Sequence, residues 1–269
     1  MSAAPTQPGL EPLRSRLREL APVVVAFSGG ADSAFLAWMA HDTLGPDEAV
    51  AVTAVSASLP SAERLGCARL ADEWGMRWDE VVTDELHNPA YARNDGDRCY
   101  WCKEALLSAL GPIAEPSGAT VCLGVNLDDL TDHRPGQRAA AERGAAFPLV
   151  DVGFTKADVR SWSRELGLST WDKPAAACLA SRLPYGTPVT LGRLSAVERA
   201  EAGLRALGFD QLRVRHHEEV ARIEVPEADL TAVLARRGDV LEAVRAAGYR
   251  WVTLDLAGLQ SGGFNQLLS

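Results

Sequence analysis

The sequence lacks an excess of positive charge, and it has no apolar run long enough to cross a membrane. Its 27 lysines and arginines are outnumbered by 36 aspartates and glutamates, so the formal net charge is −9. A long phosphate backbone requires clustered basic residues, and this balance argues against a nucleic-acid partner. A transmembrane helix needs about 20 consecutive apolar residues, and the apolar runs here have the length of strands. We therefore predict a small-molecule substrate and no membrane partner.

Cysteine is scarce, and the N-terminus lacks the pattern of a secretory signal. Residues 1–20 show no basic segment followed by an apolar run and a cleavage site of small residues. We expect a cytoplasmic protein, in which five cysteines are reduced, catalytic or metal-bound rather than paired in disulfides. Cys67 and Cys122 lie in the apolar patterns of a helix and a strand, which predicts small buried core residues. Chemistry is expected from the other three.

Apolar runs of strand length alternate with helical patterns over the first two thirds of the chain. Residues 22–27 (PVVVAF) and 49–55 predict strands that are buried on both faces, and residues 61–75 predict a helix that follows them. This alternation indicates an α/β fold with a doubly wound parallel sheet. Further strands are predicted at residues 77–83, 120–125 and 145–150, and a helix with Thr155 and Asp158 in a capping box at 155–167.

The pattern changes after a loop rich in proline, glycine and alanine at residues 172–188. A helix at 191–207, two close strands, more helix and a final strand at 249–256 predict a small α+β unit. We predict an N-terminal domain of residues 1–180, and a C-terminal domain of residues 181–269 for substrate binding and oligomerisation.

The segment SGGADS follows the first predicted strand and opens the first helix. Its glycines let the backbone approach a ligand, and the helix N-terminus presents free N–H groups to an anion. Its serine hydroxyls add donors, and its aspartate is suited to hold Mg²⁺ on phosphate oxygens. The string resembles the signature of PP-loop ATP pyrophosphatases; a capped glycine turn is the alternative. The predicted site for ATP and Mg²⁺ comprises Ser28, Gly29, Gly30, Asp32 and Ser33.

Polar residues also follow the fourth predicted strand, at the carboxyl edge where parallel sheets bind ligands. Asn126, Asp128 and Asp129 lie at this edge, and we expect Gly124 to let the backbone approach the nucleotide there. The two carboxylates are expected to order Mg²⁺ or the loop. A helix cap is the alternative for Asp128. Arg134 is a predicted substrate or phosphate contact.

Cys99 and Cys102 form a CxxC motif between two basic residues, and Cys178 lies in the segment KPAAACLASR. A CxxC motif alone fits zinc, an iron–sulfur cluster, redox chemistry or chance. A polar, loop-like stretch precedes the pair, so we expect it to open a helix, where the helix start and the neighbouring cations favour thiolates.

Five segments in order carry a more specific resemblance. They are SGGADS (28–33), DRCYWCK (97–103), GVNLDDLTDHRPG (124–136), KPAAACLASRLPYG (173–186) and RVRHH (213–217). Together they resemble the LarE family of sulfur transferases over nearly the whole chain. The resemblance implies an enzyme that takes part in the synthesis of the nickel-pincer nucleotide. This nucleotide is the cofactor of lactate racemase. Such an enzyme adenylates carboxylates of pyridinium-3,5-biscarboxylic acid mononucleotide, converts them to thiocarboxylates and forms homo-oligomers.

The resemblance also implies how sulfur is delivered. In one family variant a single cysteine, matched here by Cys178, gives up its sulfur and becomes dehydroalanine. In the other, three cysteines hold a [4Fe–4S] cluster whose open iron binds an extra sulfide. Because Cys99 and Cys102 are also present, the sequence resembles the cluster variant, fed by sulfide or another sulfur donor. A sacrificial Cys178, or a zinc site completed by a histidine, is the alternative.

Substrate-binding residues are implied for the C-terminal part. Arg213 and Arg215 alternate along a strand, so they share a face and suit bidentate binding of a phosphate. They match family positions that hold the substrate phosphate; a solvated face is the alternative. Arg182 is a similar candidate, and Glu201, with Glu198 as a competitor, matches an acidic family position. Trp101 is expected to stack on the pyridinium ring or to cover the cluster.

Three other functions are weighed against this one. An ammonia-using amide ligase resembling NAD synthetase has no need of three cysteines. A tRNA thiolase shares the phosphate loop and often the cluster, but the acidic charge argues against it. A metal-binding or scaffold protein without catalysis leaves the intact phosphate loop unexplained.

Overall fold

A computed structural model describes residues 8–130, 135–174 and 177–260, which fall into two compact units. The first comprises Met1–Glu85 and Cys99–Ala176, and the second Leu86–Arg98 and Ala177–Ser269. The inclusion of Leu86–Arg98 in the second unit has a physical cause. The amide of Asn94 donates to the carbonyls of Pro184 and Thr187, at 2.8 and 2.9 Å.

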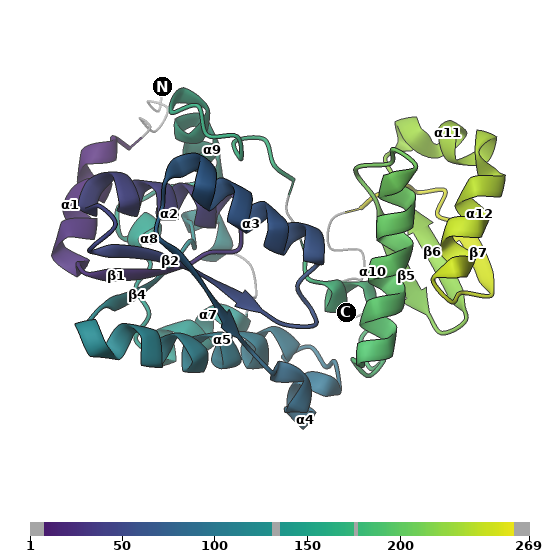
Figure 1. The fold of residues 1–269 in the computed structure, drawn as a ribbon, viewed down its shortest axis with the longest axis horizontal. Helices are drawn as coiled ribbons and strands as arrows, with labels where there is room; N and C mark the ends of the chain where they lie inside the picture. Colours follow the sequence, from purple (N-terminus) through teal and green to yellow (C-terminus); the bar gives the residue numbers. More distant parts are fainter. Residues whose placement is uncertain (1–7, 131–134, 175–176, 261–269) are drawn as a thin grey trace, which may run out of the picture. The chain divides into compact units, whose positions relative to one another are not determined.

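The first unit is built on a four-stranded parallel sheet in the order β3-β2-β1-β4. Helices cover both of its faces (Figure 1), which confirms the predicted α/β fold. The strands are β1 (Val23–Ala26), β2 (Ala49–Val55), β3 (Trp78–Val82) and β4 (Thr120–Leu123). No helix in the described part of the chain is long and apolar enough to cross a membrane.

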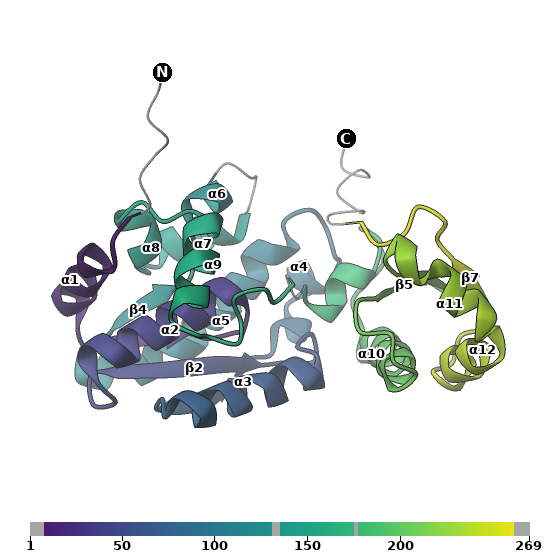
Figure 2. The same ribbon diagram turned by 90° about the horizontal axis from the view of Figure 1, so that it is seen from above.

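The core of this unit lies on both faces because successive residues of β1 point to opposite sides. Val23 and Val25 pack with α1 (Leu10–Leu20), α2 (Ala31–Leu44) and α3 (Ser61–Trp74). Val24 instead packs with Leu110 and Ala114 of α5 (Arg98–Ala114). Figure 1 shows α5 on the opposite side of the sheet from α2 and α3, and in Figure 2 α3 runs alongside β2. The remaining helices of the unit are α6 (Leu127–Leu130), α7 (Pro135–Glu142), α8 (Pro148–Asp151) and α9 (Lys156–Glu165).

Two local predictions near the end of this unit had different outcomes. The capping box of Thr155 and Asp158 is confirmed, with both of its hydrogen bonds present at the start of α9. The prediction of a fifth strand at residues 145–150 is wrong. Only an isolated bridge joins Ala146 to Cys122, and α8 begins at Pro148. Proline has no N–H for a strand ladder and is favoured at the first position of a helix, so the strand cannot extend.

The second unit is a small α+β unit, as the change of pattern predicts. Its sheet has the order β5-β6-β7, with an antiparallel pair and then a parallel one. An apolar core joins β5 and β6 to α10 (Leu191–Ala206) and α12 (Arg237–Ala246). The elements are α4 (Pro89–Ala92), α10 (Leu191–Ala206), β5 (Arg213–His217), β6 (Val220–Glu224), α11 (Leu230–Ala235), α12 (Arg237–Ala246) and β7 (Trp251–Leu254).

Candidate functional site

The strand order of the first unit fixes where a ligand is expected. The chain runs from β1 outward to β2 and β3, and then returns across the sheet to β4 on the other side of β1. The loops after β1 and β4 therefore diverge, and the carboxyl edge between them is a topological switch point, where open parallel sheets bind ligands. SGGADS follows β1 there, and Gly124 to Asn126 follow β4.

The SGGADS segment is a tight turn that delivers the chain to the start of α2. Gly29 has a φ of +67°, a conformation that side chains disfavour. The hydroxyl of Ser33 accepts the N–H of Ser28 at 3.2 Å and donates to the carbonyl of Gly30 at 3.1 Å. Gly30, the residue before the helix, provides no side-chain cap. No side chain among the described residues caps this helix start, and its first-turn N–H groups suit an anion.

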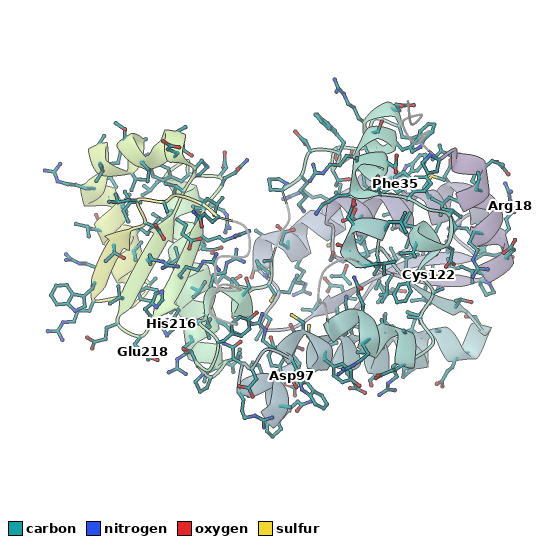
Figure 3. All side chains as sticks on the ribbon, turned by 180° about the vertical axis from the view of Figure 1, so that it is seen from behind. Arg18, Phe35, Asp97, Cys122, His216 and Glu218 are labelled. Atoms are coloured by element: carbon teal, nitrogen blue, oxygen red, sulfur yellow. The ribbon has the colours of Figure 1, made fainter. Side chains whose placement is uncertain are left out.

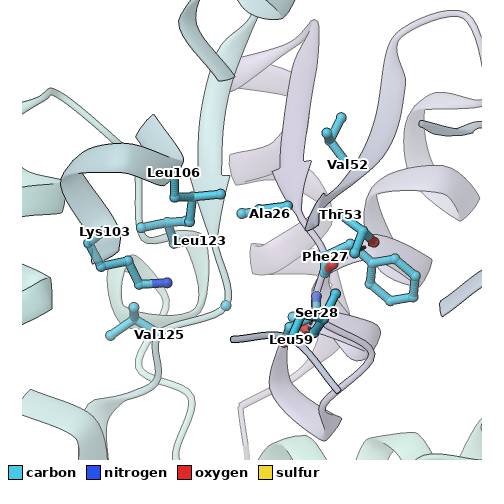
Figure 4. A pocket seen from close by; sticks show the side chains of 13 residues that line it. Ala26, Phe27, Ser28, Val52, Thr53, Leu59, Lys103, Leu106, Leu123 and Val125 are labelled. Atoms are coloured by element: carbon cyan, nitrogen blue, oxygen red, sulfur yellow. Dashed lines mark hydrogen bonds between the residues drawn. The ribbon is translucent and has the colours of Figure 1, made fainter. Parts of the chain in front are cut away.

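A mostly apolar pocket lies beside the loop, between β2 and β4 (Figure 4). Its volume is about 170 Å³, less than the 300–1,000 Å³ of sites that hold a whole drug-sized ligand. It therefore suits one part of a nucleotide, such as the base. Lys103 extends its ammonium toward the pocket (Figure 4). The other lining residues are Ala26, Phe27, Ser28, Ser33, Val52, Thr53, Ala54, Leu59, Leu106, Leu123, Gly124 and Val125.

Asp32 is the half-buried carboxylate of this site. Burial raises its pKa, the amide of Asn126 lowers it through a 3.1 Å hydrogen bond, and the nearby charge of Asp129 raises it. Asn126 is itself fully buried, and its side-chain oxygen accepts the N–H of Asp129 at 3.2 Å. The loop after β4 therefore holds the amide that positions Asp32. A carboxylate in this position fits a ligand for Mg²⁺ beside an anion.

Gly124 and Asp128 have structural partners that the sequence did not show. A Cβ at Gly124 would lie 2.8 Å from the backbone nitrogen of Ser33, so the missing side chain lets β4 approach α2. Asp128 is exposed, and its carboxylate accepts the first N–H of α9, from Lys156, at 2.7 Å. Asp128 itself lies in the first turn of α6 rather than before a helix, so it is not the cap considered as the alternative, and the capping residue of α9 is Thr155.

The CxxC motif opens α5, as predicted. Cys99 is exposed and Cys102 half-buried, and their spacing of three places both on one helix face. Trp101 between them packs edge-on to Tyr100, with ring centroids 5.2 Å apart. Arg134 lies outside the described residues.

The remaining cysteines separate into one candidate and two core residues. Cys67 and Cys122 are fully buried, which confirms their prediction, and burial raises the pKa of Cys122 to about 12. Figure 3 labels Cys122 inside the first unit. Cys178 is half-buried and belongs to the second unit. Its carbonyl accepts the N–H and the hydroxyl of Ser181, at 3.0 and 2.7 Å. Within either unit, the described residues contain no group of three or more metal-ligating side chains.

Arg182 and Glu201 meet in the second unit. The Arg182 guanidinium donates to both oxygens of Glu201, at 2.8 and 3.3 Å, and to the carbonyl of Ala177 at 2.7 Å. Glu201 also accepts Arg205 and the backbone N–H of Val214. Their substrate contacts stay predictions, because the pair satisfies itself in this structure.

Arg213 and Arg215 differ in their surroundings. Arg215 is buried, donates to both oxygens of Glu224 at 2.9 Å, and reaches the carbonyl of Ser181. Arg213 is half-buried and donates to the carbonyl of Gln260. Burial, and then the charges of Arg215 and Arg182, lower the pKa of Arg213. The charges of Glu224 and Glu201, the partners of Arg215 and Arg182, oppose this shift, so the carboxylates offset part of the positive charge around Arg213.

The strand order and the loop at the switch point define an α/β protein with a PP-loop-like domain. No family model matches the chain. It is 44% identical to an uncharacterized protein of Synechocystis sp., over 97% of this chain and 98% of that one. It is 40% identical to the pyridinium-3,5-bisthiocarboxylic acid mononucleotide synthase of Lactiplantibacillus plantarum, over 96% and 94% of the two chains. An uncharacterized protein of Methanocaldococcus jannaschii is 24% identical, over 87% and 89%. The chain belongs to the LarE family, that of the L. plantarum synthase.

Proposed function

We propose that this chain is an ATP-dependent sulfur transferase that makes the thiocarboxylates of pyridinium-3,5-bisthiocarboxylic acid mononucleotide. The observation that carries the proposal is the 40% identity, over almost the full length of both chains, to a synthase of that product. The SGGADS loop at the switch point supports ATP as the co-substrate, and the net charge of −9 disfavours tRNA.

The proposed reaction has two steps. A substrate carboxylate oxygen attacks the α-phosphorus of ATP, the bond to the β-phosphate oxygen breaks, and pyrophosphate leaves. The first-turn N–H groups of α2 stabilise the charge on the phosphates, and Asp32 would hold Mg²⁺, which neutralises the departing pyrophosphate. Hydrosulfide then attacks the acyl carbon, the bond to AMP breaks, and the thiocarboxylate remains.

The proposed sulfur centre consists of Cys99, Cys102 and Cys178. These thiols would hold a [4Fe–4S] cluster, which supplies an open iron for an exchangeable sulfide. The pair on the first turn of α5 fits this role, because it is accessible, shares one helix face and is not in a disulfide. Cys178, the third proposed ligand, is half-buried in the second unit and is likewise not in a disulfide.

A sacrificial Cys178 is the second candidate for the sulfur source. Its thiolate would attack the acyl carbon, and AMP would leave a thioester. Loss of the Cα proton and cleavage of the Cβ–S bond would then release the thiocarboxylate and leave dehydroalanine at position 178. This route needs neither Cys99 nor Cys102.

Metal analysis and intact-mass spectrometry separate the two candidates. The protein is purified without oxygen, assayed for iron and acid-labile sulfide, and weighed after turnover with ATP and the biscarboxylic nucleotide. We expect about four irons per chain and an unchanged mass, the composition of one such cluster. Cys99→Ala, Cys102→Ala and Cys178→Ala should each lower the iron content, whereas the buried control Cys122→Ala should keep it. No iron, with a mass lower by one H₂S, would establish the sacrificial route.

A further inference from the structure

Lysine is rare in this chain, and every lysine acts on the SGGADS loop, on Asp32 or on the pocket beside them in the first unit. The sequence has 24 arginines but only Lys103, Lys156 and Lys173. Lys103 lines the pocket beside the SGGADS loop, and the charge of Lys156 lowers the pKa of Asp32. Lys173 donates to the carbonyl of Gly29 within the loop. The three ammonium groups of the chain are thus associated with the SGGADS loop, the pocket beside it and Asp32.

Lys173 has the most direct contact with the loop. Its Nζ lies 3.0 Å from the Gly29 oxygen and 2.8 Å from a carboxylate oxygen of Glu63 on α3. The side chains of this ion pair are 25% and 22% exposed. Arg160 on α9 donates to the backbone carbonyls of Trp171 and Lys173, at 3.0 and 2.9 Å. Lys173 is therefore anchored through its own backbone and is held against the loop.

The ammonium of Lys173 occupies one hydrogen-bond acceptor of the loop, the carbonyl of Gly29. A free Gly29 carbonyl would repel a phosphate, and the ammonium neutralises it. An ammonium has three donors, and Gly29 and Glu63 account for two of them among the described residues. A partly exposed carboxylate binds such a cation weakly, whereas a polyphosphate presents several charged oxygens to it at once.

We propose that Lys173 binds the pyrophosphate portion of ATP and that Glu63 is the carboxylate it leaves when the phosphates arrive. This inference rests on the proposed ATP-dependent function, and it names the residue that holds the leaving group. Glu63 acts as a positioning residue, which keeps the ammonium at the loop and competes with the phosphates for it.

Competition predicts opposite effects for the two partners. Lys173→Gln removes a charge-assisted hydrogen bond of about 1.5–3 kcal/mol, so the Kd for pyrophosphate should rise about 10- to 100-fold. Glu63→Gln removes the competitor and the nearest negative charge, so the same Kd should fall. A merely structural ion pair predicts that both variants weaken binding, because either one breaks the pair.

The test is isothermal titration calorimetry of the full chain with inorganic pyrophosphate and Mg²⁺, and with adenosine as a ligand that lacks phosphate. Arg64→Gln and Glu80→Gln are matched controls, because they break an ion pair between α3 and β3 with the same charge changes. We expect only Lys173→Gln and Glu63→Gln to change pyrophosphate binding, in opposite directions, with adenosine binding constant. Thermal melts check that each variant is folded.

Two results overturn this inference while leaving the proposed function intact. One is a shift of both variants in the same direction, and the other is an equal loss of pyrophosphate binding in Arg64→Gln. Lys173→Arg provides a further check, since it keeps the charge and should retain part of the affinity. A wild-type chain that binds neither pyrophosphate nor ATP would overturn the proposed function and this inference together.

Discussion

Glu201 binds the guanidinium of Arg182 with both carboxylate oxygens, and the two side chains are only 0% and 6% exposed. The same carboxylate accepts Arg205 and the backbone N–H of Val214. It therefore links α10, β5 and the segment that follows Cys178. This gives Glu201 a structural role in the second unit that is independent of any substrate.

Removal of the Glu201 carboxylate should lower the free energy of unfolding of the second unit. Glu201→Ala leaves a buried guanidinium unpaired, and we expect a loss of about 3–5 kcal/mol in the free energy of unfolding, measured by urea denaturation. Glu242→Ala, at an exposed position on α12 of the same unit, serves as the control and should cost less than about 1 kcal/mol. Equal losses in the two variants would contradict the structural role.

Arg213 and Arg215 should respond differently to the same substitution. Arg215→Ala leaves Glu224 buried without its bidentate partner and should destabilise the chain by about 3–5 kcal/mol. Arg213→Ala should leave the fold intact. If Arg213 binds the substrate phosphate, its removal should weaken nucleotide binding by about tenfold or more, the equivalent of 1.4 kcal/mol. Calorimetric titration of the folded variant measures this affinity. An unchanged affinity would show that Arg213 does not contact the substrate phosphate.

Much of the fold was predictable because its signals are local. The alternation of buried strands and helices indicates the parallel sheet, and the Thr155 capping box marks the start of α9 at the correct residue. The glycine-rich turn before α2 and the helix opened by Cys99 are also local patterns. The strand predicted at residues 145–150 failed because apolar content was weighed above the helix-starting position of Pro148.

The ionised Asp32 carboxylate should lower the free energy of unfolding at neutral pH. Burial raises its pKa, so the folded chain binds its proton more tightly than the unfolded chain does. Stability from this group is therefore lost as pH rises from the ordinary aspartate range through the raised pKa. Asp32→Asn should raise the melting temperature at neutral pH, by about 2–4 °C for each kcal/mol gained, and should abolish ATP-dependent pyrophosphate release. A lower melting temperature, measured by calorimetry, would show that the carboxylate stabilises the loop.

The same pKa shift predicts a pH dependence of metal–nucleotide binding. Ionised Asp32 is the form that binds Mg²⁺, so affinity for Mg²⁺ and ATP should fall as pH falls through the raised pKa of this group. Asn126→Ala removes the hydrogen bond that favours the ionised form, so the fall should begin at higher pH. Titrations that begin in the ordinary aspartate range and continue to neutral pH would reveal the shift. An identical profile in the two proteins would contradict it.

Gly124 should not tolerate even one added carbon. A Cβ there would lie 2.8 Å from the backbone of Ser33, where no flexible side chain can move aside. Gly124→Ala should cost about 1–3 kcal/mol, or separate β4 from α2 and disorder the loop. Gly66→Ala on α3 is the control, because its nearest contact is a side-chain end 3.9 Å away, and it should be neutral or stabilising by about 0.5–1 kcal/mol. Urea denaturation of both variants checks the difference.

The candidate site was only partly predictable, because several of its contacts join distant parts of the chain. Lys173 is 144 residues from Gly29, and nothing in the local pattern around it indicates a partner in the phosphate loop. Likewise, Asn94 belongs to the second unit through carbonyls about ninety residues away. Spacing identified Cys99 and Cys102 as a pair, but the pairing of Arg182 with Glu201 depends on how the chain folds back.

The path of the chain has a consequence for protein engineering. The backbone passes between the two units after Glu85, after Arg98 and after Ala176, so no single cut separates them. A truncation at residue 176 would strip Asn94 and Arg98 of their carbonyl partners at Pro184 and Ala180. A fragment of the first unit should replace Leu86–Arg98 with a short linker. A fragment of the second unit should include Leu86–Arg98, joined to the chain from Ala177 onward.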